Sequence, residues 1–399
     1  MGNYLFGPLV VDLVDSEFSR EFLSDFSGIE RTERDPDLVV TPVDHFREPP
    51  LGTGERVQVS ADEVYIDHRF GESTNPVKRT VEGRVGKTGF QAVIREGEGT
   101  LELDVHYDGD LYENPRTPLR TLLKYRNRSC MYRREVTARD MFYDVFEPVV
   151  QLQLVDRNHS FVHASGVVTD EGAVLFTGDG GVGKTSTSAA LVREDDLRLI
   201  SDDVTIVSGD GTVRPYPKSC VVYPSDFRDR DVPEGLFGSA LEKYHWKARR
   251  RTQGVKGVRR RSRLDELYGA DRVNYETQPV STVVFLSCGD TDTIEVTEMS
   301  VGTAAERSAR TICDELTPFT TEYLSAIRES RPEWPSQACL HDRASAVFAD
   351  CFGGAELKHV RVPDGTSPAA LAEFVRQHVV SDRGHDRTPA SPDIGLSRA

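Results

Sequence analysis

The sequence predicts an α/β fold preceded by a smaller β-rich region, and three patterns in the chain support this prediction. Apolar and polar residues alternate in short stretches between residues 56 and 107, as they do in half-buried strands. An apolar stretch at 173–177 leads into a glycine-rich loop and then into a helix-forming segment. The apolar run 280–288 has the length and composition of a buried strand. The last two patterns together indicate a sheet with helices packed against it.

These patterns divide the chain of 399 residues into four segments. Residues 1–115 are predicted to form a β-rich amino-terminal domain. Residues 116–158 are predicted to form a helical connector, because apolar residues recur there at spacings of three and four. Residues 159–380 are predicted to form the main α/β domain. Residues 381–399 have little apolar content, so we expect a disordered tail there.

Charge and terminal sequence restrict the partners and the location that we expect. The chain has 49 Lys and Arg residues against 65 Asp and Glu residues, a formal net charge of −16. Nucleic acid is therefore not an expected partner, because its general binders depend on positive charge. The amino terminus lacks the basic segment of a signal peptide, and no window approaches 18 uninterrupted apolar residues. We expect a cytoplasmic protein without membrane insertion.

A phosphate-binding loop is the motif that bears most directly on function. Residues 178–185 read GDGGVGKT and satisfy the pattern G-x-x-x-x-G-K-[ST], with a strand before the loop and a helix after it. Glycines let the main chain wrap around a polyphosphate, and the helix amino terminus adds partial positive charge. We therefore predict an ATP site formed by Gly178, Asp179, Gly180, Gly181, Val182, Gly183, Lys184, Thr185 and Ser186.

Lysine, threonine and aspartate side chains complete the predicted site. Lys184 is expected between the β- and γ-phosphates, and Thr185 is expected to hold Mg²⁺ through its hydroxyl. Asp202 and Asp203 follow the apolar segment LRLIS at a strand end. One carboxylate would face the metal or its waters while the other orients or deprotonates an acceptor hydroxyl. Their individual roles stay open, with Asp203 joining Thr185 in the predicted metal set; a solvated strand-end pair is the alternative.

A second V-G-K-T occurs at residues 85–88, but it lacks the context of a phosphate loop. The earlier glycine that the pattern requires is replaced by Val81. The segment FQAVIRE that follows is typical of a strand rather than a helix. We predict a hairpin turn there.

From His163 to Asp203 the sequence resembles the carboxy-terminal kinase domain of the HPr kinase/phosphorylase family, whose phosphate-loop fold is related to phosphoenolpyruvate carboxykinase. The family carries a His-led strand, a second strand, a G-D-S-G-V-G-K-S loop and an Asp-Asp pair. This chain reads HASGVVTDEGAVLFTGDGGVGKT and then LISDD. The residues alone favour a structural role for His163. The resemblance instead implies a P-loop kinase fold, an oligomer, and a catalytic group made of His163, Asp202 and Asp203.

The leading hypothesis is an ATP- and Mg²⁺-dependent phosphotransferase acting on a hydroxyl of a protein serine or a small metabolite. Two alternatives stay open. One is a nucleotide-binding sensor or assembly protein in which bound ATP orders a segment without phosphorylating anything, and the other is a simple NTPase whose acceptor is water.

Two further segments are candidate parts of the site. The basic stretch 243–263 is either a loop that closes on an anionic acceptor or on ATP, a solvated insertion, or a contact with a second subunit. Tyr216, Pro217 and Lys218 either line the acceptor side or form a strand-end turn.

Overall fold

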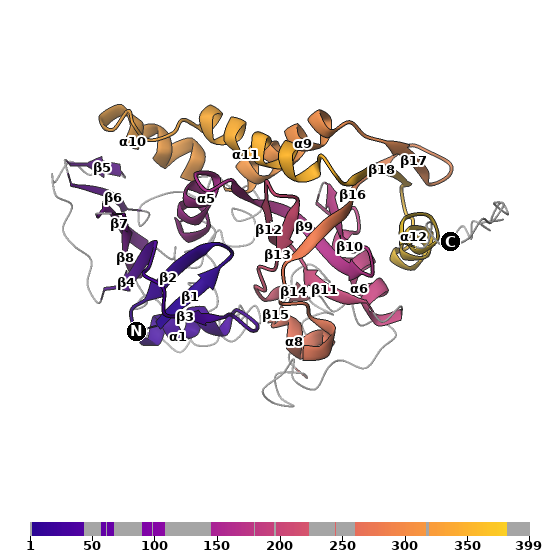
Figure 1. Cartoon of the computed structure of the whole chain (residues 1–399), viewed down its shortest axis with the longest axis horizontal. Coiled ribbons are helices and arrows are strands. Elements are labelled where there is room, and N and C mark those ends of the chain that lie inside the picture. Colours follow the sequence, from indigo (N-terminus) through magenta and orange to yellow (C-terminus); the bar gives the residue numbers. More distant parts are fainter. Residues whose placement is uncertain are drawn as a thin grey trace, which may run out of the picture.

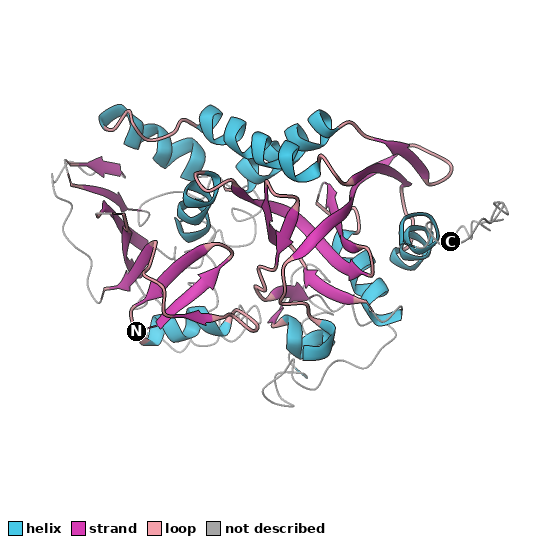
Figure 2. Cartoon of the chain, in the orientation of Figure 1, coloured by secondary structure: helices cyan, strands magenta, loops and turns pink. Residues whose placement is uncertain are grey.

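The computed structural model describes residues 2–43, 57–60, 62–67, 90–97, 99–107, 145–178, 180–194, 197–222, 244, 260–316 and 319–380. Within these residues the chain forms two large sheets with helices beside and above them (Figure 1). Figure 2 shows strands on both the left and the right of the molecule and a row of helices along its top. The α/β class predicted from the sequence is therefore confirmed. None of the helices in the described ranges combines the length and apolar character that a membrane crossing requires.

The first sheet is built from residues before 108 and has the strand order β3-β1-β2-β4-β8-β7-β6-β5. Its alternation is clear in β8, where Leu101, Leu103 and Val105 are buried and Glu102 is exposed. The expected strand after the second V-G-K-T is confirmed as β7, while residues 85–88 themselves lie outside the described residues. The elements are β1 (Gly2–Phe6), β2 (Leu9–Leu13), α1 (Glu17–Ser24), β3 (Arg31–Thr32), β4 (Leu38–Pro42), β5 (Val57–Val59), β6 (Glu63–Asp67), β7 (Phe90–Glu96) and β8 (Leu101–Tyr107).

The second sheet has the order β10-β9-β12-β13-β16-β18-β17, with β11 paired to β9 and β10 also paired to β16. Strands β10, β16 and β18 are parallel, so their carboxyl ends lie at one edge of the sheet. The strands predicted at 173–177 and 280–288 are confirmed as β10 and β16. The strands are β9 (His159–Thr169), β10 (Gly172–Gly178), β11 (Arg198–Ser201), β12 (Val204–Ser208), β13 (Thr212–Arg214), β16 (Gln278–Gly289), β17 (Glu295–Glu298) and β18 (Glu356–Pro363).

Helices cover both faces of this second sheet. Helices α9, α10 and α11 extend across the top of both sheets in Figure 1, while α6 and α12 lie on the opposite face. Serine caps the amino ends of α9, α11 and α12, each hydroxyl accepting a main-chain N–H. The helices are α5 (Glu147–Val155), α6 (Lys184–Glu194), α8 (Leu264–Tyr268), α9 (Val301–Glu315), α10 (Leu324–Ser330), α11 (Gln337–Phe352) and α12 (Pro368–Val375).

One hydrophobic core continues from the first sheet into the second. Phe22 and Phe146 meet edge to face with ring centroids 5.0 Å apart, and Tyr216 packs against Phe161 at 4.9 Å. Beside these rings the Lys218 ammonium donates to Glu147 at 2.6 Å in a buried ion pair. The described elements of the two sheets thus pack together, and the domain boundaries assigned from the sequence stay a prediction.

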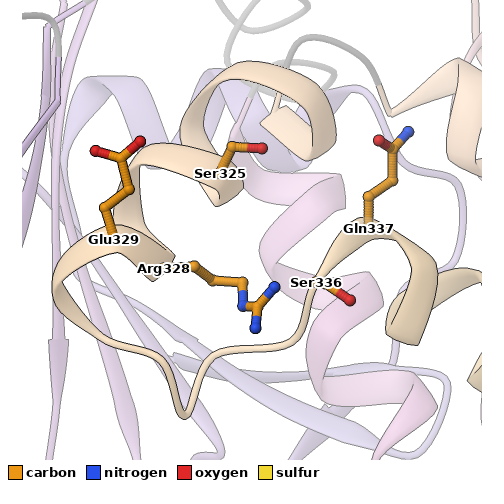
Figure 3. A pocket seen from close by; sticks show the side chains of 5 residues that line it. All are labelled: Ser325, Arg328, Glu329, Ser336 and Gln337. Carbon is orange, nitrogen blue, oxygen red and sulfur yellow. The ribbon is translucent and has the colours of Figure 1, made fainter.

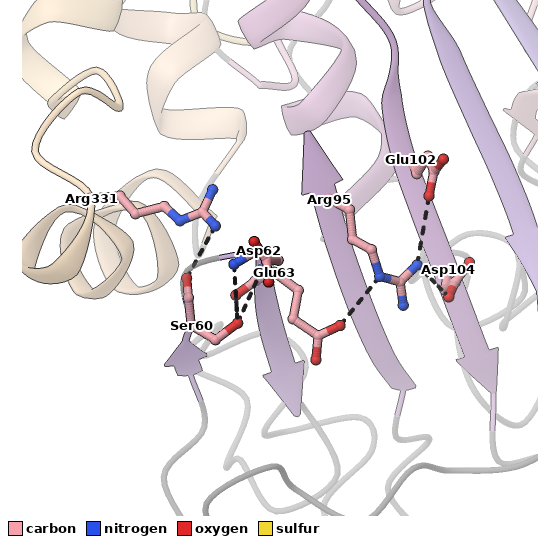
Figure 4. Close-up of polar contacts among 7 residues, drawn as sticks. All are labelled: Ser60, Asp62, Glu63, Arg95, Glu102, Asp104 and Arg331. Carbon is pink, nitrogen blue, oxygen red and sulfur yellow. Dashed lines mark hydrogen bonds and ion pairs between the residues drawn. The ribbon is translucent and has the colours of Figure 1, made fainter. Parts of the chain in front are cut away.

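A second contact joins the first sheet to the helices above it. The Arg331 guanidinium donates to the Ser60 carbonyl at 3.1 Å (Figure 4), and the Trp334 indole donates to Glu96 at 2.7 Å. Nearby, Arg95 bridges carboxylates of the two flanking strands, Glu63 and Asp104. Cross-strand pairs of this kind support the register of β6, β7 and β8. The helical layer is therefore fixed to the edge of the first sheet by polar contacts as well as by packing.

Candidate functional site

The glycine-rich loop between β10 and α6 has a conformation that requires glycine. Gly178, Gly181 and Gly183 have φ values of +131°, +82° and +104°. A Cβ atom at Gly178 would lie 2.0 Å from the carbonyl oxygen of Leu286 in β16, whereas one at Gly180 or Gly181 would meet nothing within 4 Å. The loop is therefore tight against the sheet where it begins and open to its surroundings at its centre. Asp179 lies outside the described residues.

The helix that follows the loop begins with a lysine held against the loop. Lys184 is 7% exposed, and its ammonium donates to the Gly178 carbonyl at 2.6 Å. Val182 is buried in the core on the α6 side, which fixes the middle of the loop. The N–H of Thr187 donates to the Gly183 carbonyl at 2.8 Å and continues the helical pattern. A cation, the end of a parallel strand and a helix amino terminus thus meet at one place, as an anion-binding loop requires.

The two aspartates lie in the bend between β11 and β12, beside the first turn of α6. The Thr185 hydroxyl donates to the main-chain carbonyl of Asp202 at 3.5 Å. Asp202 is buried, at 7% exposed, while the Asp203 side chain is 44% exposed. This contact is made by the main chain of Asp202, so the expectation that the two carboxylates face the loop stays a prediction. The two carboxylates have different surroundings, as expected for neighbours at a strand end.

His163 approaches the same place from the neighbouring strand. Strand β12 pairs with β9 so that Val204 lies opposite His163. His163 Nδ1 consequently lies 3.7 Å from Asp203 Oδ1, and it lies 4.0 Å from Glu315 Oε1 at the end of α9. Within the described residues this buried nitrogen has no hydrogen-bond partner. The histidine therefore lies between two carboxylates that come from different parts of the chain.

Glu315 was not predicted from the sequence. It lies at the carboxyl end of α9, far along the chain from His163, and no motif surrounds it. Only the packing of α9 across β9 brings its carboxylate to the histidine.

The groups present fit a nucleotide with Mg²⁺. The Thr185 hydroxyl and the aspartate carboxylates of the neighbouring bend are the kinds of oxygen ligand that Mg²⁺ prefers, Lys184 supplies a positive charge, and a Cβ at Gly180 would meet nothing within 4 Å. Ser186 lies half-buried in the same first turn of α6. In the described part of the chain, no three His, Cys, Asp or Glu side chains gather into a metal site. A nucleotide-bound Mg²⁺ takes most of its ligands from phosphates and water, so it needs only one or two protein oxygens.

Comparisons with known proteins add little to this geometry. No protein-family model matches the chain, and no curated protein matches it. Among solved structures, the chain is similar to the Hpr(Ser) kinase/phosphatase from Coxiella burnetii, at 13% identity and a TM-score of 0.26. That match covers 55% of this chain and 95% of the other.

Other residues that the sequence suggests for the site do not lie beside the glycine-rich loop in the described structure. Tyr216 and Lys218 are buried between the two sheets, so the hypothesis that they line the acceptor side is wrong. The basic stretch falls mostly outside the described residues, and at its end Arg263 pairs with Asp265. The predicted tail, 381–399, and residues 116–144 of the connector also lie outside them.

A surface depression of about 340 Å³ lies apart from the loop, where α10 is followed by α11 (Figure 3). Its lining side chains are polar and include none of the loop residues: Ser325, Arg328, Glu329, Ser336 and Gln337.

Proposed function

We propose that this protein is an ATP- and Mg²⁺-dependent phosphotransferase that transfers a phosphoryl group to a hydroxyl. The observation that carries the proposal is the meeting of His163, Asp203 and the loop at one edge of the second sheet. A nucleotide loop alone would suit any NTP-binding protein. The histidine and the exposed carboxylate add groups that can handle the proton of an acceptor.

In this proposal the main chain of residues 178–185 and Lys184 hold the phosphates of ATP, and Thr185 supplies a hydroxyl ligand to the metal. Bound Mg²⁺ would neutralise phosphate charge. Asp203 accepts the proton of the acceptor hydroxyl while the oxygen of that hydroxyl attacks the γ-phosphorus of ATP. ADP leaves with the electrons of the broken P–O bond. His163 orients Asp203, with Glu315 on its other side.

This assignment moves Asp203 from the metal set to the acceptor side. The reason is that Asp203 is the more exposed carboxylate and lies beside His163, while the Thr185 hydroxyl contacts the main-chain carbonyl of Asp202. Asp202 would then remain beside Thr185, on the metal side of the site.

The decisive experiment measures ATP binding and phosphoryl transfer in a Lys184→Ala variant. We expect binding and transfer to be lost, because the ammonium neutralises phosphate charge at the loop. The matched control is Lys87→Ala, in the second V-G-K-T, which should retain both. A Lys184→Ala variant with unchanged turnover would contradict the proposal.

The same assay separates the two alternatives. Incubation with γ-labelled ATP and a cell-extract fraction would place label on a protein or a metabolite if the proposal is right. Phosphate release at the same rate without any acceptor would identify an NTPase. Tight ATP binding with neither label transfer nor phosphate release would identify a sensor.

A further inference from the structure

A second polar cluster lies on the other side of the loop strand from His163. The Ser287 hydroxyl in β16 and His359 Nε2 in β18 are 2.8 Å apart, and both residues are half-buried. The two strands are parallel, with Ser287 opposite Arg361. Serine and histidine side chains from neighbouring strands thus form a hydrogen-bonded pair that solvent can reach.

This pair lies beside the start of the phosphate loop. Strand β16 pairs with β10 so that Leu286 lies opposite Gly178, and Ser287 is the next residue along β16. Neighbouring strands are about 4.8 Å apart, so β18 lies roughly 10 Å from the strand that leads into the loop. The Ser287–His359 pair and the loop therefore share the carboxyl edge of the parallel strands, where α/β sheets bind ligands.

One helix reaches both the pair and His163. Leu286 packs with Phe176 in the core on the α6 side, so the alternation of a strand turns Ser287 towards α9. His163 Nδ1 lies 4.0 Å from Glu315 Oε1, at the carboxyl end of the same helix.

Positive charge gathers around the pair. Burial, Arg307 on α9 and Arg361 on β18 all lower the pKa of His359. Arg307 is exposed and makes no ion pair with the described residues. Arg361 has an ion pair with Glu295 at 3.5 Å, but both side chains are half exposed, so this pair holds the guanidinium weakly. A hydroxyl, an imidazole and two guanidinium groups are the donors that bind phosphate.

We propose that Ser287, His359, Arg307 and Arg361 form a subsite for a phosphate group that the phosphoryl acceptor already carries. This inference rests on the proposed function, and it narrows the acceptor class to small phosphorylated hydroxyl compounds. Arg307 and Glu315 are eight residues apart on α9, a separation of about 12 Å along the helix. An acceptor bound along the exposed side of α9 that carries Arg307 and Glu315 would place its phosphate near Arg307 and its free hydroxyl near His163 and Asp203.

The subsite is tested first with inorganic phosphate as the probe, on the full chain without ATP. The ring signal of His359 is followed by proton NMR at fixed pH and assigned with a His359→Gln variant. We expect a saturable shift of that signal. In Arg307→Gln and Arg361→Gln variants the phosphate affinity should fall roughly tenfold or more, since charge-assisted hydrogen bonds are lost. Arg310→Gln is the matched control, because Arg310 is exposed on the same helix and pairs with Glu306.

The outcomes separate this inference from the proposed function. A Lys184→Ala variant should keep the phosphate response of His359 while losing ATP binding. No phosphate response in the natural chain, or the same affinity in all three arginine variants, would overturn the subsite.

Transfer assays give the second readout. With glycerol and glycerol 3-phosphate as paired acceptors, Arg307→Gln should raise KM for the phosphorylated acceptor and leave the unphosphorylated one unchanged. Equal effects on both acceptors would overturn the subsite. A His359 phosphate response without transfer to any acceptor would support the subsite and contradict the proposed function.

Discussion

His163 Nδ1 lies 3.7 Å from Asp203 Oδ1, and this pair stands where the phosphate loop meets the neighbouring strands. The two residues come from β9 and from the bend before β12, and strand pairing fixes their approach. The histidine is largely buried and the carboxylate is half exposed. An exposed base held by a buried partner can meet a substrate while keeping its orientation, so the pair yields a specific prediction.

Asp203→Asn should lower phosphoryl transfer by about 10² to 10⁴-fold, because the amide cannot accept the proton of the acceptor. Affinity for ATP should be retained, since Lys184 and the loop are unchanged. Steady-state kinetics together with an ATP-binding titration check both parts. Asp170→Asn is the matched control, because Asp170 is an exposed residue in the turn at the far end of β9. If ATP affinity fell as much as transfer, Asp203 would belong to the nucleotide side.

Gly178→Ala should destabilise the protein strongly, whereas Gly180→Ala should hardly change its stability. A methyl group at Gly178 would lie 2.0 Å from the Leu286 carbonyl in a conformation with φ of +131°, so we expect a loss of at least about 2 kcal/mol. Gly180 has no neighbour within 4 Å, and its variant should stay within about 0.5 kcal/mol of the natural chain. Chemical denaturation measures both. Equal stability of the two variants would show that the loop does not lie against β16.

Replacing one partner of the buried ion pair of Lys218 and Glu147 should lower the free energy of unfolding. Lys218→Met removes the counter-charge of the buried Glu147 carboxylate, and Glu147→Gln removes that of the buried Lys218 ammonium, so each should destabilise the protein by about 3 to 5 kcal/mol. The double variant should be more stable than the sum of the two losses predicts. The control cycle uses the exposed pair Arg310 and Glu306, whose coupling should be about 0.5 kcal/mol or less. Strict additivity at Lys218 and Glu147 would argue against a direct interaction.

Cysteine labelling should follow burial. Burial and Asp210 raise the pKa of the Cys351 thiol to about 12, and burial with Asp314 raises that of Cys313 to about 11. A raised pKa leaves almost no thiolate at pH 8, and the thiolate is the reactive species. Among the cysteines of the described residues, Cys288 is exposed and should react first. Peptide mapping after brief treatment with a thiol reagent checks the order, and early modification of Cys351 would contradict the packing of α11 on the second sheet.

Much of the local structure was predictable because it depends on neighbouring residues. Apolar runs predicted β10, β11 and β16, and the glycine pattern predicted the turn from β10 into α6. Strand β18 escaped prediction. This strand lies between two helices in the chain, and its sequence, ELKHVRVP, alternates charged and apolar residues. Its pairing with β16 decides which of its side chains are buried. A short strand inside a helical region carries too little local signal to stand out.

Long-range contacts account for what could not be predicted. The sequence identified His163, Asp202 and Asp203 individually, whereas the pairing of β12 with β9 brings the histidine to the second aspartate. Glu315 had no local signal. The same is true of Lys218, which was weighed as an acceptor residue and lies instead against Glu147 in the core.

By itself, then, the sequence determined the strand β10, the glycine-rich loop and the helix α6, because glycine conformations and apolar periodicity are properties of neighbouring residues. Only the tertiary structure decided which side chains surround that loop. Strand register and the path of α9 bring together residues more than a hundred positions apart, as His163 and Glu315 show. Such contacts depend on how whole elements pack, which no short pattern in the chain encodes.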